Sequence, residues 1–153
     1  MAVEFANETE FELDEQHYLR LLNYLMQQLE LHPKSEVGLL FVSEGTIAEL
    51  NSQWLGEEGP TDVLSFPIDE VAPFGRWLGS EPGVLGDIVL CPSYAARQAA
   101  TKGSSSKAEF ELLVTHGLLH LVGFDHDEPT AEREMFDLQE RLLIQFRGET
   151  EGA

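Results

Sequence analysis

The spacing of hydrophobic residues along the chain predicts strands that alternate with helices. Apolar side chains recur at helical spacing over residues 14–31, behind Asp14, whose carboxylate suits a helix N-cap. Short apolar runs bounded by polar residues predict buried strands at 37–42, 63–66 and 85–90, and a weaker strand at 3–7. Thr46 and Glu49, three residues apart, form a capping-box pattern that predicts a short second helix.

The second half of the chain is predicted to be mainly helical. Helices are expected at residues 92–101 and 107–122, and a last one begins near Pro129 and ends at Gly148. The connection at 67–83 is rich in proline and glycine, so no regular structure is expected there. Strands interleaved with helices, followed by three helices, predict an α/β (α+β layered) fold in which about five helices pack on a small mixed sheet.

Length and composition predict one compact domain spanning residues 1–153, with 149–153 as a frayed tail. The amino terminus has no basic segment followed by an apolar core, as a secretory signal would, and no apolar run is long enough for a membrane span. Cys91 is the sole cysteine, so it has no disulfide partner within the chain and is expected to be buried. These features predict a cytoplasmic protein.

The charge argues against a broad nucleic-acid interface. The 28 acidic and 9 basic residues give a formal net charge of −19, whereas nonspecific affinity for nucleic acid comes from neutralising phosphates. Arg97, Lys102 and Lys107 do cluster just before the predicted helix at 107–122. They form either a local basic rim for a substrate or an ordinary solvated surface.

Three histidines in this predicted helix and the turn after it indicate a metal site. His116 and His120 are four residues apart, so on a helix their imidazoles lie one turn apart on the same face. Gly123 can end the helix and direct His126 back toward them. Three protein ligands leave the fourth position of a tetrahedral zinc ion open, as in catalytic sites, so one zinc ion per chain is expected.

The alternative is that these are ordinary histidines satisfied by backbone or water. Apolar neighbours argue against it, because unpaired imidazoles would be costly there. Asp125 and Asp127 flank the third histidine and could accept a ligand's second ring N–H, or they could simply form a solvated turn. His17 and His32 have no other potential metal ligands at a suitable spacing and are predicted to lie on the surface.

A zinc site of this kind predicts a hydrolase. The ion lets water ionise near neutral pH and polarises carbonyl or phosphoryl oxygens, so peptide, amide and phosphodiester substrates are all possible. The histidine spacing matches that of metzincin proteases, but Gly117 stands where those enzymes have their general-base glutamate. A phosphodiesterase is therefore favoured over a protease.

The segment from His116 to His126 resembles the H-G-x-L-H-L-x-G-[FYW]-D-H signature of the YbeY family of bacterial single-strand endoribonucleases, and it matches at every position. Two further blocks are similar to that family: Leu50-Asn51 followed by Pro60-Thr-Asp-Val-Leu-Ser-Phe-Pro67, and Gly86-Asp87-Ile88. The resemblance implies the family's α/β fold and a metal held by His116, His120 and His126. It also implies action in ribosomal RNA maturation, at the 3′ end of 16S rRNA, and in ribosome quality control.

The resemblance further implies single-stranded ribosomal RNA as substrate, and the small ribosomal subunit or its proteins as partners. One position departs from the family pattern. An arginine usually follows the aromatic residue of the upstream block, but Leu55 follows Trp54 here, so the role of that arginine has moved or activity is weak. The candidates to replace the arginine are Arg76, Arg97 and Lys102.

Other residues are weaker candidates. Thr61, Asp62 and Ser65 are expected to line the substrate groove together with Arg97 and Lys102, although the first three also fit a plain turn and strand. An acid such as Asp87 within a strand needs a partner if buried, so it could hold the Thr61 loop or a ligand histidine. With Asp125, it is a candidate to support the metal ligands.

Two other functions stay open at this stage. One is a zinc metalloprotease or amidase whose general base comes from elsewhere in the fold. The other is a non-enzymatic ribosome assembly factor in which a fourth protein ligand closes a structural zinc site, and Cys91 is the only thiol that could do so.

Overall fold

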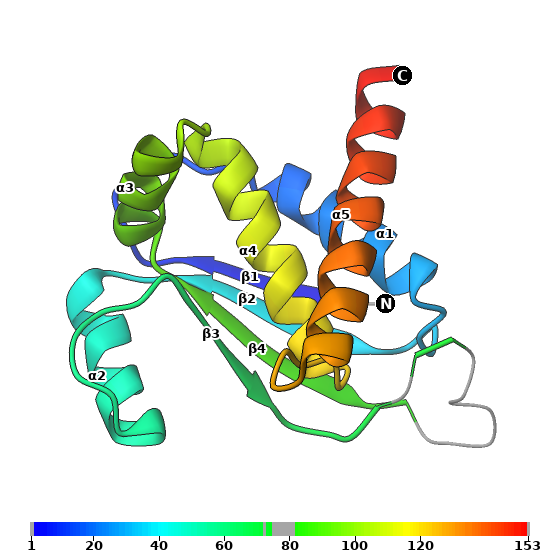
Figure 1. The fold of residues 1–153 in the computed structure, drawn as a ribbon, viewed down its shortest axis with the longest axis horizontal. Coiled ribbons are helices and arrows are strands. Elements are labelled where there is room, and N and C mark those ends of the chain that lie inside the picture. Colours follow the sequence, from blue (N-terminus) through cyan, green and yellow to red (C-terminus); the bar gives the residue numbers. More distant parts are fainter. Residues whose placement is uncertain (1, 72, 75–81, 153) are drawn as a thin grey trace.

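Four strands form one mixed sheet in the order β1-β2-β4-β3 (Figure 1). The computed structural model describes residues 2–71, 73–74 and 82–152. The strands are β1 (Ala2–Asn7), β2 (Glu36–Phe41), β3 (Val63–Pro67) and β4 (Val84–Leu90), and the helices are α1 (Glu15–Gln28), α2 (Glu44–Leu55), α3 (Pro92–Lys102), α4 (Ser106–Leu121) and α5 (Pro129–Gly152). The predicted α/β class, with a mixed sheet and five helices, is confirmed.

The direction of the strands explains the connections between them. β1, β2 and β4 run parallel, and β3 pairs antiparallel with β4. Parallel neighbours need long crossovers, which the helices provide. β3 is an edge strand whose end, at Pro67, pairs with Gly86. This edge, beside α4, is where the histidine segment reaches the sheet (Figure 1).

The sheet separates two hydrophobic clusters. Ile88 belongs to the larger cluster, between the sheet and helices α1, α4 and α5, whereas its neighbour Val89 belongs to a smaller one with Ile47 of α2. Successive strand residues point to opposite faces, so α2 packs on the face away from α4. Cys91 is free and buried in the smaller cluster, as expected for an isolated cysteine.

Side-chain caps fix the helix starts, and two predicted boundaries are wrong. Asp14 caps α1 as predicted, accepting from the backbone of His17. The cap of α2 is Ser43, whose hydroxyl accepts from the Thr46 backbone, so the helix begins before the predicted capping box. α5 continues through Gly148 to Gly152, so the predicted helix end at Gly148 is wrong. A helical glycine costs only about 1 kcal/mol relative to alanine, which the flanking turns offset.

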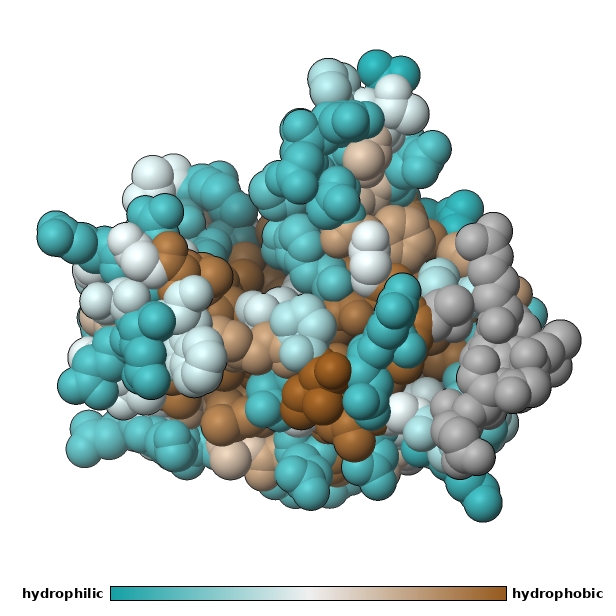
Figure 2. Space-filling view, turned by 90° about the horizontal axis from the view of Figure 1, so that it is seen from below, coloured by the Kyte–Doolittle hydropathy of each residue, from teal (hydrophilic) through white to brown (hydrophobic). Residues whose placement is uncertain are grey.

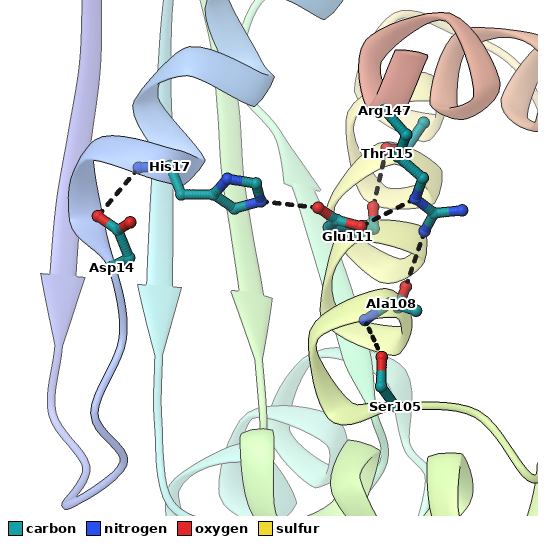
Figure 3. A network of polar contacts seen from close by, with 7 residues as sticks. All are labelled: Asp14, His17, Ser105, Ala108, Glu111, Thr115 and Arg147. Atoms are coloured by element: carbon teal, nitrogen blue, oxygen red, sulfur yellow. Dashed lines mark hydrogen bonds and ion pairs between the residues drawn. The ribbon is translucent and has the colours of Figure 1, made fainter. Parts of the chain in front are cut away.

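A buried polar network ties three helices together (Figure 3). His17 of α1 is only 5% exposed, so its predicted surface position is wrong. Its Nε2 lies 2.7 Å from Oε2 of Glu111 on α4, and Arg147 of α5 donates from Nε to the other carboxylate oxygen at 3.0 Å. No local sequence signal indicates this pairing, because the partners lie 94 and 36 positions away from Glu111. His32 is half-buried.

In the part of the chain that the structure describes, no helix combines the length and the apolar character that a membrane span requires.

Candidate functional site

The end of α4 and the turn after it bring the three histidines together. His116 and His120 lie one helical turn apart, and their Nε2 atoms are 3.1 Å from each other. Gly123 has a φ of +100°, which glycine adopts without strain, and the Phe124 backbone N–H donates to the carbonyl of Leu119 at 3.0 Å. The reversal returns the chain, so the ring of His126 lies 5.2 Å from that of His120 and 5.7 Å from that of His116.

These distances suit a single small cation. One ring nitrogen from each of the three histidines can be chosen so that all three lie within 4.8 Å of one another. Zinc–nitrogen bonds of about 2.0–2.1 Å place two ligand nitrogens of a tetrahedral site slightly more than 3 Å apart, close to the separation of His116 and His120. The three imidazoles could therefore hold one metal ion.

Gln139 of α5 orients the first of these rings. Nδ1 of His116 lies 3.0 Å from Oε1 of Gln139, and an amide oxygen can only accept, so Nδ1 carries the proton and Nε2 presents its lone pair to the site. The sequence reasoning did not identify Gln139 as a site residue. The pattern that could have indicated it is a polar residue on the inward face of the last helix, between Met135 and Leu142. In the structure Gln139 is only 9% exposed.

Burial keeps the two helical histidines neutral, which is the form that binds metal. Desolvation lowers the pKa of His116, and the nearby His126 lowers it further against the opposing effects of Gln139 and Asp62. Desolvation also lowers the pKa of His120, assisted by the two other histidines. Both rings therefore stay unprotonated below the ordinary histidine pKa.

Asp125 and Asp87, the two acids expected to support the ligands, occupy different parts of the structure. Asp125 is exposed, accepts from the backbone of Asp127 at 3.3 Å and acts on His120 only through its charge. Asp87 neighbours Gly38 of β2, because a Cβ at Gly38 would meet its Oδ1. By strand alternation Asp87 points away from Ile88 and hence away from α4. The hydrogen bonds to the ligand rings come from other groups, Gln139 for His116 and the backbone of Phe124 for His120.

Gly117 lets α4 lie directly on the sheet. A Cβ added there would be 2.8 Å from Cγ2 of Ile88 and 3.2 Å from the hydroxyl of Ser65. That hydroxyl donates to the Gly117 carbonyl at 3.0 Å, fastening β3 to the histidine helix. The residue after the first histidine therefore faces the sheet, and there is no space there for a side chain.

The histidines lie in a groove of about 1040 Å³. Its lining comes from the end of α2, from β3, from α4 and from the start of α5: Leu55, Glu57, Asp62, Val63, Leu64, Ser65, Pro67, Leu112, Leu113, His116, His120, His126, Asp127, Phe136 and Gln139. The predicted lining residues Asp62 and Ser65 are among them. Thr61 is half-buried just before them and its hydroxyl donates to Asp62 at 3.3 Å.

Asp62 also organises the entry to β3. One carboxylate oxygen accepts from the Val63 backbone at 2.7 Å, and the other accepts from the Gln98 side chain of α3 at 2.9 Å. The upstream block thus shapes the wall of the groove through turn chemistry, which is the structural role that its sequence also allowed.

The comparisons with known proteins agree with this architecture. The family model described as Endoribonuclease YbeY matches residues 3–147. Endoribonuclease YbeY of Beutenbergia cavernae is 51% identical over 146 residues, covering 95% of this chain and 97% of that protein. The chain belongs to the YbeY family of endoribonucleases.

Two further comparisons support this assignment. Endoribonuclease YbeY of Thermobifida fusca is 49% identical over 147 residues, covering 96% of this chain and 95% of that protein. The solution structure of TM1509 from Thermotoga maritima has a TM-score of 0.69 and 28% identity, and the match covers 98% of this chain and 92% of that one. The resemblance inferred from the three sequence blocks is therefore confirmed over nearly the whole chain.

Arg97, Lys102 and Arg76 are the candidates to replace the family arginine. The first two lie away from the groove, and the third lies outside the described residues. Arg97 forms a two-point ion pair with Glu44 of α2, and Lys102 pairs at 2.7 Å with Glu109, which is 2% exposed. Both line a separate hollow beside Tyr94. Leu55 itself is at the groove, 57% exposed.

Replacing Gln139 by alanine is expected to weaken metal binding by about 10- to 100-fold, the usual effect of losing the hydrogen bond that orients a ligand histidine. His116 would lose the acceptor that holds its Nδ1 proton. Competition with a zinc-binding dye measures the affinity. Glu140→Ala, an exposed neighbour on α5, is the control, and equal affinity in Gln139→Ala and wild type would contradict the assignment.

Proposed function

We propose that this chain is a zinc-dependent endoribonuclease that cleaves single-stranded RNA and acts in ribosomal RNA maturation, including the 3′ end of 16S rRNA, and in ribosome quality control. The observation that carries the proposal is the convergence of three histidine nitrogens, within 4.8 Å of one another, in an open groove of a YbeY-family fold. His116, His120 and His126 are the proposed zinc ligands, with one ion per chain.

The donor set fits zinc. Three neutral imidazoles satisfy its preference for nitrogen ligands, and no carboxylate belongs to the candidate group among the described residues, as it would for magnesium. When bound, zinc supplies Lewis-acid chemistry, by which it acidifies water and polarises a phosphoryl oxygen. Leaving the fourth position to water or substrate is what a catalytic role requires.

The chain's own residues prepare the site for this chemistry. Gln139 holds the proton of His116 on Nδ1, and the Gly123 turn brings His126 back to the helix. Ser65 and Gly117 hold α4 on β3, so the histidines stay fixed relative to the groove wall. A prearranged set of ligands favours catalysis because little reorganisation is needed during the reaction.

Two observations favour this proposal over the alternatives. Gly117 faces the sheet, so a protease-type glutamate has no space at that position. Cys91 lies in the small cluster with Ile47, on the face of the sheet away from α4, so it is badly placed to close a structural zinc site. Both points leave the phosphodiester as the best substrate class.

The strongly acidic composition bears on the partners of this activity. A net charge of −19 gives weak intrinsic attraction for RNA, so we propose that the small ribosomal subunit or its proteins deliver the substrate, in the cytoplasm. Pull-down of subunits from a bacterial lysate by the zinc-loaded protein would test this step separately from catalysis.

Zinc removal provides the direct test of the proposed activity. The purified protein is expected to contain one zinc ion per chain and to cleave an unstructured RNA oligonucleotide but not its duplex. Chelation should abolish cleavage, and stoichiometric zinc should restore it, because the ligand set requires the metal for its chemistry. Cleavage that persists at the same rate in the metal-free protein would refute the proposal.

A further inference from the structure

The wall of the histidine groove is unusual for a site that accepts RNA. Three carboxylates line it, those of Glu57, Asp62 and Asp127, and none of its described lining residues is a lysine or an arginine. Proteins that track a nucleic-acid backbone use cationic grooves, because phosphate contacts supply most of their affinity. Apart from a bound metal ion, these walls would repel phosphates, so another part of the nucleotide must supply the attraction.

Phe136 is the aromatic residue placed to supply it. It lies near the start of α5 and lines the groove, with its ring 6.2 Å from that of His116 and 6.1 Å from that of His126. The planes are tilted by only 35° and 31°. Phe136 is nevertheless 40% exposed, so much of the ring remains available to a ligand next to the proposed metal.

Core packing does not account for this exposure. Four apolar residues of α5 belong to the core cluster and are at most 8% exposed: Met135, Leu138, Leu142 and Phe146. Phe136 instead shares the groove with other exposed apolar side chains, among them Leu55, which is 57% exposed. Seen from below, the molecule has apolar surface across the middle of its face, between hydrophilic side chains (Figure 2).

We propose that Phe136 is a stacking platform for one unpaired nucleobase, adjacent to the phosphate that the histidine site attacks. The inference rests on the proposed function and adds a physical basis for strand selection. A base within a duplex is already stacked and paired, so its face is not available to Phe136, whereas a single-stranded base can turn out and stack. Base–aromatic stacking needs no cation, which suits the acidic walls.

The stack is tested with zinc-loaded protein and short RNA oligonucleotides that carry 2-aminopurine, a base whose fluorescence is quenched by stacking. Rapid mixing records binding before cleavage. Phe136→Leu keeps an apolar side chain of similar size but removes the ring, and Phe136→Trp keeps a ring. Ile144→Ala is the control, because Ile144 is 60% exposed on the same helix but lines a different hollow.

Phe136→Leu is expected to weaken binding about tenfold and to remove the quenching, the effect of losing a single stacked base. Phe136→Trp and Ile144→Ala should bind like wild type. An abasic nucleotide at one position near the cleavage site should weaken wild-type binding by the same factor and leave Phe136→Leu unaffected. Such non-additivity identifies a direct interaction between the ring and that base.

Three results would overturn the stacking role. The first is unchanged RNA affinity and unchanged quenching in Phe136→Leu, and the second is full affinity of wild type for RNA that is abasic throughout. The third is RNA affinity of wild type that falls with salt as steeply as several phosphate contacts require. If wild type still cleaves single-stranded RNA in these cases, the proposed function stands and only the platform is lost. If wild type neither binds nor cleaves the RNA, both proposals fail.

Discussion

Replacing His116 with alanine is expected to abolish stoichiometric zinc binding and to reduce cleavage of single-stranded RNA by more than about 100-fold. That factor is the upper end of the effect of losing an outer-shell partner such as Gln139, and the loss of a ligand must exceed it. His116 contributes both the Nε2 atom 3.1 Å from that of His120 and the ring that Gln139 orients. Two remaining imidazoles are too few to hold zinc at micromolar concentration with an open position.

The measurement combines metal analysis of the purified variant with single-turnover RNA cleavage. His32→Ala is the matched control, because His32 is half-buried outside the groove, where its Nδ1 accepts from the backbone of Lys34 at 3.0 Å. The control should keep wild-type zinc content and rate. A His116→Ala protein that retains one tightly bound zinc ion would show that the three histidines are not the metal site.

Introducing the protease-type glutamate, Gly117→Glu, is expected to lower the free energy of unfolding by at least about 3 kcal/mol. Overpacking a core costs about 1–3 kcal/mol, and burying an unpaired carboxylate adds to it. The new Cβ would be 2.8 Å from Cγ2 of Ile88, so α4 would have to move off the sheet. The histidines move with the helix, so zinc affinity should fall as well, and no peptidase activity should appear.

Urea denaturation of the metal-free protein measures the change in stability, and casein hydrolysis tests for peptidase activity. Gly148→Ala is the matched control, because it is also a helical glycine but has nothing within 4 Å of an added Cβ. That change should stabilise the protein slightly, by about 0.5–1 kcal/mol, as alanine restricts the unfolded chain. Unchanged stability in Gly117→Glu would mean that α4 is not packed on β3 and β4 as closely as described.

Local sequence signals predicted the elements of the fold well. Residues 37–42 and 85–90 became β2 and β4 with boundaries shifted by one residue, because short buried strands are marked by apolar runs that depend on nearby residues alone. Helix boundaries were less secure. Ser43 and Thr46 both have a capping side chain, and the choice between them depends on where the backbone leaves β2.

The same distinction holds for the site. His116 and His120 were predictable because helical spacing alone brings them to one face, and Gly123 because its turn is a local event. The sequence did not show that Arg97 and Lys102 line a hollow separate from the histidine groove, since their positions depend on carboxylates of other elements, Glu44 and Glu109, with which they pair.

By itself, the sequence determined the family, the α/β class and the three candidate metal ligands, because these depend on periodicity and on spacing within one continuous segment. Only the tertiary structure decided which residues surround the ligands. Gln139 reaches His116 from 23 positions away and Ser65 reaches Gly117 from 52, while the ring of Phe136 on α5 lies beside those of His116 and His126. Such contacts arise when separate helices and strands pack, and the linear pattern of polar and apolar residues does not record which neighbours will meet.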